Sequence, residues 1–256
     1  MLIDVHAHVG RLGKREYSHE VLKRYADECQ LDRVLVSNIS AADPDAGGAG
    51  VEEPDANLAT LKLAHDAPVV VPVYWLRPGH LDHSLYALAG ALDSEPFAGV
   101  FLAPLLNNFT WSAELLSDEL RVLEQAQKPV LASCGRRNGA KPSELHALAT
   151  RHPGLAFVFC CGTDVHWADY IDCIRRAKDR NDARLYLSTA HASVEEIVNA
   201  VRLLGAEHVL FGTDAAVHGA EHGAQVAQLL TDLRDALAGS DYSKITGENA
   251  EQLFAA

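Results

Sequence analysis

Eight short apolar runs recur along this chain, about 25 to 40 residues apart. Each run is rich in Val, Leu, Ile or Phe and shows little alternation with polar residues. Strands that are buried on both faces of a parallel sheet have this composition. The runs are Leu2–Val9, Arg33–Ser40, Val69–Leu76, Phe97–Ala103, Pro129–Cys134, Ala156–Cys161, Arg184–Thr189 and Val209–Thr213. We therefore expect eight parallel strands that are covered on both faces.

The segments between these runs have helical periodicity, which is clearest after the seventh run. Ser193 and Glu196 have the spacing of a capping box. Apolar residues from Val194 to Val201 form a stripe, and Gly205 suits the C-terminal stop. Eight strands alternating with helices predict an α/β fold, a (β/α)8 TIM barrel that occupies residues 1–256 as one domain. An open doubly wound sheet usually has a Gly-rich loop after its first strand, whereas this strand ends in His-Ala-His.

The formal net charge of −13 argues against two classes of partner. A nucleic-acid binder needs a basic surface to neutralise phosphates, and an anionic membrane would repel this chain. No stretch approaches the ~20 apolar residues of a membrane-spanning helix. No basic leader precedes the first run, so we expect a cytoplasmic protein. The five cysteines include no CxxC pair, which favours free thiols. The sequence leaves open whether the chain forms a homo-oligomer.

Polar residues at the strand ends matter most, because the C-terminal ends of barrel strands form the mouth. His6 and His8 lie two residues apart in the first run and therefore point to the same side. Asp214 follows the eighth run, which barrel closure places beside the first. Two histidines and one carboxylate suffice for a catalytic zinc with an open position, or for an iron site. Asp214 would be a ligand or the base that takes a proton from metal-bound water. Two hydrogen-bonded core histidines are the simpler alternative.

Three segments resemble the amidohydrolase superfamily, in particular its branch of simple metal-dependent hydrolases and decarboxylases. They read IDVHAHVG at the start, VLFGTDA near residue 210 and ITGENAEQLF at the end. Two further segments, PVLASCGR and RHPGLAFVFCCG, fall where that family has its fifth and sixth strands. The resemblance spans the whole chain, and it implies a metal-dependent enzyme.

The same resemblance exposes departures from the family pattern. At the fifth and sixth strands the family usually has metal-binding histidines, but this chain has Ser133, followed by Cys134, and then Cys160 and Cys161. The fourth segment, residues 99–104, contains neither Lys nor His, which argues for a site with one metal. Either a cysteine thiolate replaces the lost imidazoles, or the metal site has decayed. Adjacent cysteines cannot both point into a barrel, and a buried cysteine is commonly just a small apolar residue.

Four other residues should lie on the same face of the barrel. His191 follows the seventh strand and is a further candidate substitute ligand. Arg136, His166 and His218 are candidate substrate contacts, and Arg136 could clamp a carboxylate with two hydrogen bonds. Each of them has a simpler interpretation as a solvated loop residue. The Gly-, Ala- and Asp-rich segment Ala41–Pro54 predicts a long loop on this face, placed as a lid would be.

We expect a metal-dependent hydrolase that acts on a C–N or C–O bond of a small molecule through hydroxide on one divalent ion, zinc by preference. A metal-dependent decarboxylase would use the same site. The alternative is a catalytically degenerate barrel that serves as a binding or partner subunit, which the missing ligands favour. A tightly held metal stabilises a fold by mass action, so a chelator should lower the melting temperature only of the enzyme.

Overall fold

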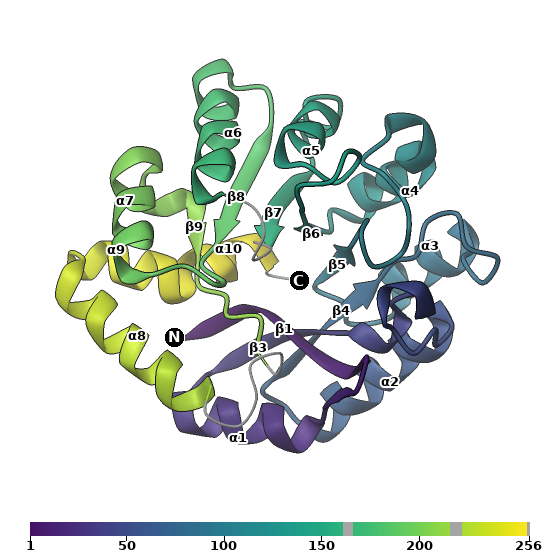
Figure 1. Ribbon diagram of the computed structural model, residues 1–256, viewed down its shortest axis with the longest axis horizontal. Coiled ribbons are helices and arrows are strands. Elements are labelled where there is room, and N and C mark those ends of the chain that lie inside the picture. Colours follow the sequence, from purple (N-terminus) through teal and green to yellow (C-terminus); the bar gives the residue numbers. More distant parts are fainter. Residues whose placement is uncertain (161–165, 216–221, 255–256) are drawn as a thin grey trace.

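The computed structural model describes residues 1–160, 166–215 and 222–254 of the chain. One nine-stranded sheet, in the order β2-β1-β3-β4-β5-β6-β7-β8-β9, forms its centre (Figure 1). Neighbours from β1 through β3 to β9 are parallel, and β2 pairs antiparallel with β1. The strands are β1 (Ile3–Leu12), β2 (Arg15–Tyr17), β3 (Arg33–Asn38), β4 (Val70–Trp75), β5 (Gly99–Leu102), β6 (Val130–Ser133), β7 (Ala156–Cys160), β8 (Arg184–Ser188) and β9 (Val209–Leu210).

The eight parallel strands close into a barrel where the segment after β9 meets β1. The backbone N–H of Val5 donates to the carbonyl of Phe211 over 3.0 Å, and that of His8 donates to Ala215 over 3.2 Å. Ala7 and Ala215 form a parallel bridge. The (β/α)8 barrel is thus confirmed, and closure sets residues 211–215 directly beside the two histidines of β1.

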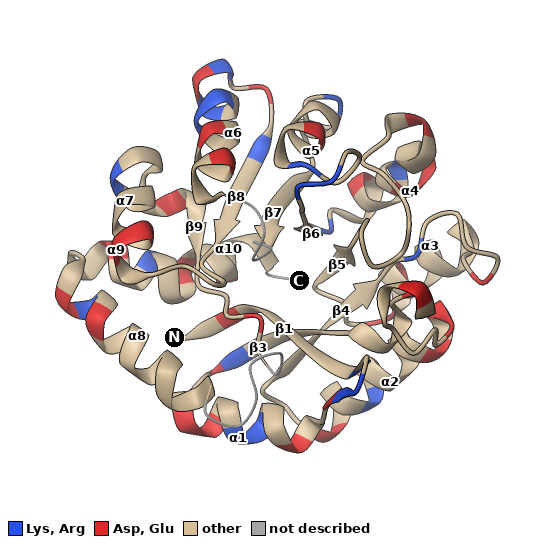
Figure 2. Ribbon diagram, in the orientation of Figure 1, with Lys and Arg blue, Asp and Glu red and all other residues tan. Residues whose placement is uncertain are grey.

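Helices surround the barrel, as Figure 1 shows. They are α1 (His19–Cys29), α2 (Glu53–Asp66), α3 (Leu85–Ser94), α4 (Ala113–Ala126), α5 (Pro142–Ala149), α6 (Trp167–Arg180), α7 (Val194–Leu204), α8 (His222–Ala236), α9 (Gly239–Ser243) and α10 (Asn249–Phe254), with a π-helical turn at Lys244–Glu248. The capping box predicted for α7 is present, and Gly205 ends that helix with φ of +91°. In the part of the chain that the structure describes, every helix is too short or too polar to cross a bilayer. Acidic residues are spread over the outer helices (Figure 2).

Strand residues alternate between two hydrophobic cores. One set, including Val5, Trp75 and Phe101, fills the interior of the barrel. The other set packs between the strands and the helices, and it includes Leu102 and Cys134. Among the described residues, side chains thus fill the barrel interior beneath the mouth.

The segment that the sequence predicts as a long loop is fastened to its neighbours. It contains 3-10 turns at Ile39–Ala41 and Pro44–Ala46. The backbone N–H of Asp43 donates to Leu106 over 2.8 Å, and Gly48 forms a bridge with Leu12. These bonds tie the segment both to the β1–β2 hairpin and to the loop after β5, so it forms a fixed wall of the mouth.

Candidate metal centre at the barrel mouth

The two histidines of β1 and Asp214 converge at the mouth of the barrel. His6 Nε2 and His8 Nε2 are 3.2 Å apart. Asp214 Oδ1 lies 3.4 Å from His8 Nε2 and 3.7 Å from His6 Nε2. One ligand atom of each residue lies within 4.8 Å of the others. Both histidines are buried, and their period-two spacing aims both Nε2 atoms at one point, as predicted.

The protonation states of these groups suit a cation. Burial lowers the pKa of His6 to about 3 and also lowers the pKa of His8, although the nearby Asp214 carboxylate opposes both shifts. Burial raises the pKa of Asp214, but its contacts with His6, His191 and His8 outweigh burial and lower it. At neutral pH the site therefore offers two neutral imidazoles and a carboxylate, which are the forms that bind metals.

Hydrogen bonds behind the histidines fix their orientation. His8 Nδ1 shares a hydrogen bond of 2.9 Å with Ser37 Oγ, which leaves Nε2 to face the mouth. His6 Nδ1 is buried and has no hydrogen-bond partner among the described residues. A hydrogen bond on the far nitrogen sets the tautomer of a ligand histidine, so the structure supplies this support for His8.

Asp4 supports the site through the backbone. Its carboxylate is fully buried and accepts the N–H of His6 over 2.9 Å. It also accepts the hydroxyl of Tyr25 over 2.7 Å and that of Thr213 over 2.6 Å. Burial raises the pKa of Asp4 to about 6, although these bonds oppose that shift. Asp4 therefore supports His6 through its main chain, and it joins β1 to the segment that carries Asp214.

His191 contacts the other oxygen of Asp214. Its Nε2 lies 3.0 Å from Asp214 Oδ2, whereas Oδ1 faces the two histidines of β1. Two hydrogen bonds to the main chain hold the segment after β8 beside the segment that carries Asp214. The hydroxyl of Thr189 donates to the carbonyl of Gly212 and accepts its N–H, each over 3.0 Å. His191, predicted as a substitute ligand, thus lies outside the group of three and touches its carboxylate.

The thiols add no ligand to the group among the described residues. Cys134 packs in the outer core between strands and helices and is not part of the group of three, so its role as a substitute ligand stays a prediction. Cys160 points into the barrel interior but is not part of the ligand group. Ser133 pairs with Cys160, so Cys134, the next residue after Ser133, faces the opposite way. Cys161 and His218 lie outside the described residues.

Aromatic rings fill the space beneath the histidines. Phe101, on the fourth barrel strand, lies 4.9 Å from the ring of His8 and 5.7 Å from the ring of His6. Trp75 lies 4.9 Å from Phe101 and 5.9 Å from His8. From the sequence this strand is notable only because it lacks Lys and His. Strand parity places residues 75 and 101 in the barrel interior, but only the structure reveals their contact with the histidines.

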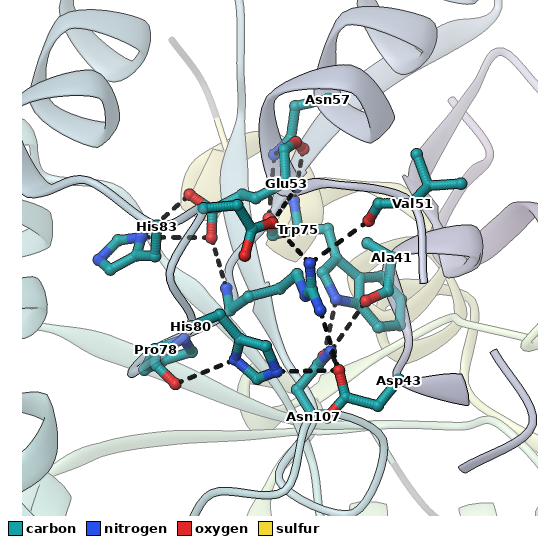
Figure 3. Close-up of polar contacts among 12 residues, drawn as sticks. Ala41, Asp43, Val51, Glu53, Asn57, Trp75, Pro78, His80, His83 and Asn107 are labelled. Atoms are coloured by element: carbon teal, nitrogen blue, oxygen red, sulfur yellow. Dashed lines mark hydrogen bonds and ion pairs between the residues drawn. The ribbon is translucent and has the colours of Figure 1, made fainter. Parts of the chain in front are cut away.

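A cluster of charged residues braces one side of the mouth (Figure 3). Arg77 Nη2 lies 3.0 Å from Asp43 Oδ1, and Arg77 Nη1 lies 2.5 Å from Asp82 Oδ2. His80 Nε2 binds the same oxygen of Asp43 over 2.8 Å. These contacts join the segment after β3 to the loop after β4. This cluster could not be predicted from the sequence, since its members are far apart in the chain and form no motif.

Glu53, at the start of α2, anchors the base of that cluster. It is 1% exposed and accepts the hydroxyl of Tyr74 over 2.7 Å and the N–H of Arg77 over 2.6 Å. His83 lies between Glu53, at 3.0 Å, and Glu119, at 3.4 Å. Burial lowers the pKa of His83, but its contacts with the two carboxylates outweigh burial and raise it to about 9.

Two predicted substrate contacts lie on one cavity away from the ligand group. Arg136 and His166 line a space of about 460 Å³ between the loop after β6 and α6, together with Lys141 and Arg176. None of the residues that line this cavity belongs to the ligand group. The structure thus brings Arg136 and His166 together, without placing them beside His6 and His8.

Comparisons with known proteins agree with this architecture. The sequence matches the amidohydrolase family over residues 3–255. No curated protein matches it. Similar solved structures include 2,6-dihydroxybenzoate decarboxylase with 2,6-dihydroxybenzoate (TM-score 0.72, 13% identity, covering 99% of this chain and 98% of that one). Another is 4-oxalomesaconate hydratase from Rhodopseudomonas palustris (TM-score 0.70, 13% identity, covering 100% of this chain and 96% of that one). A third is 5-carboxyvanillate decarboxylase from Novosphingobium aromaticivorans with manganese and a nitrobenzoic acid (TM-score 0.72, 11% identity, covering 100% of this chain and 96% of that one). At these identities the likeness shows the fold alone.

Proposed function

Because this chain belongs to the amidohydrolase family, we propose that it is a metal-dependent enzyme that acts on a small molecule. The reaction is hydrolysis of a C–N or C–O bond, or decarboxylation at the same site. One observation carries the proposal, namely the convergence of His6 Nε2, His8 Nε2 and Asp214 Oδ1 within 4.8 Å in a buried mouth. Three such donors on one side of a cation leave positions for water and substrate.

The donor set fits one divalent ion. His6 Nε2 and His8 Nε2 are 3.2 Å apart, so one neutral ring can donate a hydrogen bond to the other, and Asp214 Oδ1 lies 3.4 Å from His8 Nε2. A cation would take the place of that shared proton between the three donors. Phe101 fills the place from which a lysine could bridge a second metal, so we propose a mononuclear site. Zinc is our first choice for the ion. Manganese, which a similar decarboxylase structure contains, suits the same donors.

A bound ion would polarise a substrate oxygen and lower the pKa of bound water. The chain's own residues then divide the remaining tasks. His6 and His8 hold the site in place, and the interior aromatic rings keep water from beneath it. Asp214 presents Oδ1 to the site and Oδ2 to His191, so this pair is placed to accept and release a proton. Arg136 and His166 are proposed to contact a distal part of the substrate.

The alternative, a degenerate barrel that binds a ligand or partner, has one observation in its favour. Ser133 and Cys160 stand at strand ends where the family usually has histidines, and neither joins the ligand group. A site with three donors can still be catalytic, so these departures weaken the site without removing it.

Metal analysis separates the two proposals. We would purify untagged protein without chelator and measure zinc, manganese and iron by inductively coupled plasma mass spectrometry. The His6→Ala/His8→Ala variant is compared with a His19→Ala/His65→Ala control, because both of those residues are exposed. About one ion per chain in wild type and control, lost in the first variant, supports the enzyme and justifies screening amides, lactones and carboxylated aromatics. No ion in any protein, even after dialysis against zinc and manganese, rejects it.

A further inference from the structure

Two buried asparagines hold Trp75, as the dashed lines in Figure 3 show. Asn57 on α2 donates from Nδ2 to the carbonyl of Trp75 over 2.9 Å and accepts its backbone N–H at Oδ1 over 2.7 Å. Asn107, after β5, accepts the indole Nε1–H over 2.8 Å. Trp75 and Asn107 are fully buried, and Asn57 is nearly so. Every polar atom of Trp75 is therefore occupied.

This degree of fixation is not simply what burial of an indole requires. Trp111 is also buried, yet its Nε1 has no hydrogen-bond partner among the described residues. Burying the carboxamide of Asn107 costs free energy unless its own donors are satisfied, and Nδ2 donates to the carbonyl of Ala41 over 2.9 Å. The chain thus maintains a second buried polar group whose oxygen fixes the plane of one indole.

The fixed indole packs against a proposed metal ligand. The rings of Trp75 and His8 are 5.9 Å apart at 64°, and Phe101 lies 4.9 Å from both of them. Together with the hydrogen bond between His8 Nδ1 and Ser37 Oγ, these two rings surround the imidazole of His8. A rotation of the indole would remove one of these walls and let Nε2 of His8 turn away from Asp214.

We propose that Asn107 is a positioning residue of the metal centre. By holding the indole of Trp75 it keeps the imidazole of His8 in the orientation in which Nε2 faces His6 and Asp214. The effect on metal affinity rests on the proposed function, whereas the effect on the His8 ring does not. Loss of an outer partner of a metal ligand typically weakens metal binding about 10- to 100-fold.

A double-mutant cycle tests the connection from Asn107 through Trp75. The dissociation constant for Mn²⁺ is measured by chelator competition for wild type, Asn107→Leu, Trp75→Phe and the double variant. We expect each single variant to bind at least about 10-fold more weakly. The double variant should bind Mn²⁺ no more weakly than the single variant with the lower affinity, because both changes remove the same hydrogen bond. Wild-type affinity in Asn107→Leu, or losses that multiply in the double variant, would overturn the proposal.

Trp111→Phe is the matched control, since it shortens a buried tryptophan that has no ring contact with either histidine among the described residues. Its affinity should stay within about twofold of wild type while its melting temperature falls. If Trp111→Phe weakens Mn²⁺ binding as much as Trp75→Phe, general loosening is the cause and the proposal fails. Circular dichroism checks that each variant is folded. If Asn107→Leu does not fold, the Mn²⁺ affinities of Trp75→Phe and Trp111→Phe decide whether the indole that Asn107 holds supports the metal centre.

A metal-free measurement keeps this inference separate from the proposed function. Long-range ¹H–¹⁵N spectra of chelator-treated protein report the ring nitrogens of His8, assigned through His8→Gln. Asn107→Leu and Trp75→Phe should shift or broaden these signals, and Trp111→Phe should leave them unchanged. If wild type binds no metal, the proposed function fails and these spectra alone decide the role of Asn107. Unchanged His8 signals in both Asn107→Leu and Trp75→Phe reject it.

Discussion

His191 and Asp214 face each other across the ends of two neighbouring barrel strands with both backbones in the left-handed region. Their φ values are +62° and +55°, and His191 Nε2 donates to Asp214 Oδ2 over 3.0 Å. Side chains other than Gly, Asn and Asp rarely adopt this conformation, which costs about 1 kcal/mol or more. The surrounding bonds of Thr189 and Gly212 hold this arrangement in place. Asp tolerates this region, so the strain falls on His191, and its retention at a proposed site favours a functional role for that residue.

We predict that His191→Asn lowers kcat by about 100-fold or more while the metal content stays near wild type. Asn tolerates the left-handed backbone, so the change removes the imidazole with little added strain. Removing a proton-transfer partner typically costs 10²- to 10⁴-fold in rate. Steady-state kinetics on a substrate found by screening, together with metal analysis of the same sample, provide the check. Loss of the metal in this variant would instead make His191 a ligand.

Removing the metal should lower the melting temperature of wild type. A ligand present at 100 times its dissociation constant stabilises the folded state by about 2.7 kcal/mol. For a chain of this length that corresponds to a fall of about 5 to 10 °C when a chelator is added. Differential scanning fluorimetry with and without the chelator measures the fall. The control is Asp214→Asn, whose melting temperature should respond little to the chelator because the anionic donor is gone.

We also predict that His83→Leu destabilises the fold, although it leaves the three proposed ligands in place. The imidazolium lies between the buried carboxylates of Glu53 and Glu119, and removing it leaves both negative charges without that partner. Truncating one member of a buried ion pair typically costs about 3 to 5 kcal/mol. Urea unfolding at pH 7 measures the loss. A triple variant that also carries Glu53→Gln and Glu119→Gln should lose less than His83→Leu alone, if unpaired charge is the cause.

The barrel and the three proposed ligands follow from local sequence patterns. Each barrel strand is buried on both faces, so its apolar run is visible without knowledge of its partners. The convergence of His6 with His8 follows from strand parity, and their nearness to Asp214 follows from barrel closure. The antiparallel strand β2 was not predicted, because three residues are too few to form a recognisable pattern.

The supporting contacts could not be predicted in the same way. Asn107 meets the indole of Trp75 across 32 residues of sequence, and Asp43 meets Arg77 across 34. Such pairs depend on how the loops after β3, β4 and β5 pack against one another at the mouth, and no sequence periodicity predicts that packing. The opposite orientations of Cys134 and Cys160 likewise depend on the pairing of β6 with β7, in which Ser133 lies beside Cys160.

The histidines also predict how the metal-free protein responds to acid. Burial lowers the pKa of His6 to about 3, below its ordinary value of 6.5, so between these values the unfolded chain binds a proton that the folded chain excludes. Stability contributed by this group is complete above pH 6.5 and falls as the pH drops toward 3. Asp4 acts in the opposite sense, because its pKa is raised from 3.8 to about 6 and the folded chain takes up the proton first.

Comparing a variant with wild type isolates the contribution of His6 from that of Asp4. We predict that chelator-treated wild type loses more stability between pH 6 and pH 4 than His6→Gln does. The difference should approach about 1.4 kcal/mol per pH unit, the value for one proton. Urea unfolding at intervals of half a pH unit measures both slopes. The exposed His19→Gln serves as the control and should follow wild type. Parallel slopes for wild type and His6→Gln would mean that the pKa of His6 is the same in the folded and the unfolded chain, so that burial does not lower it.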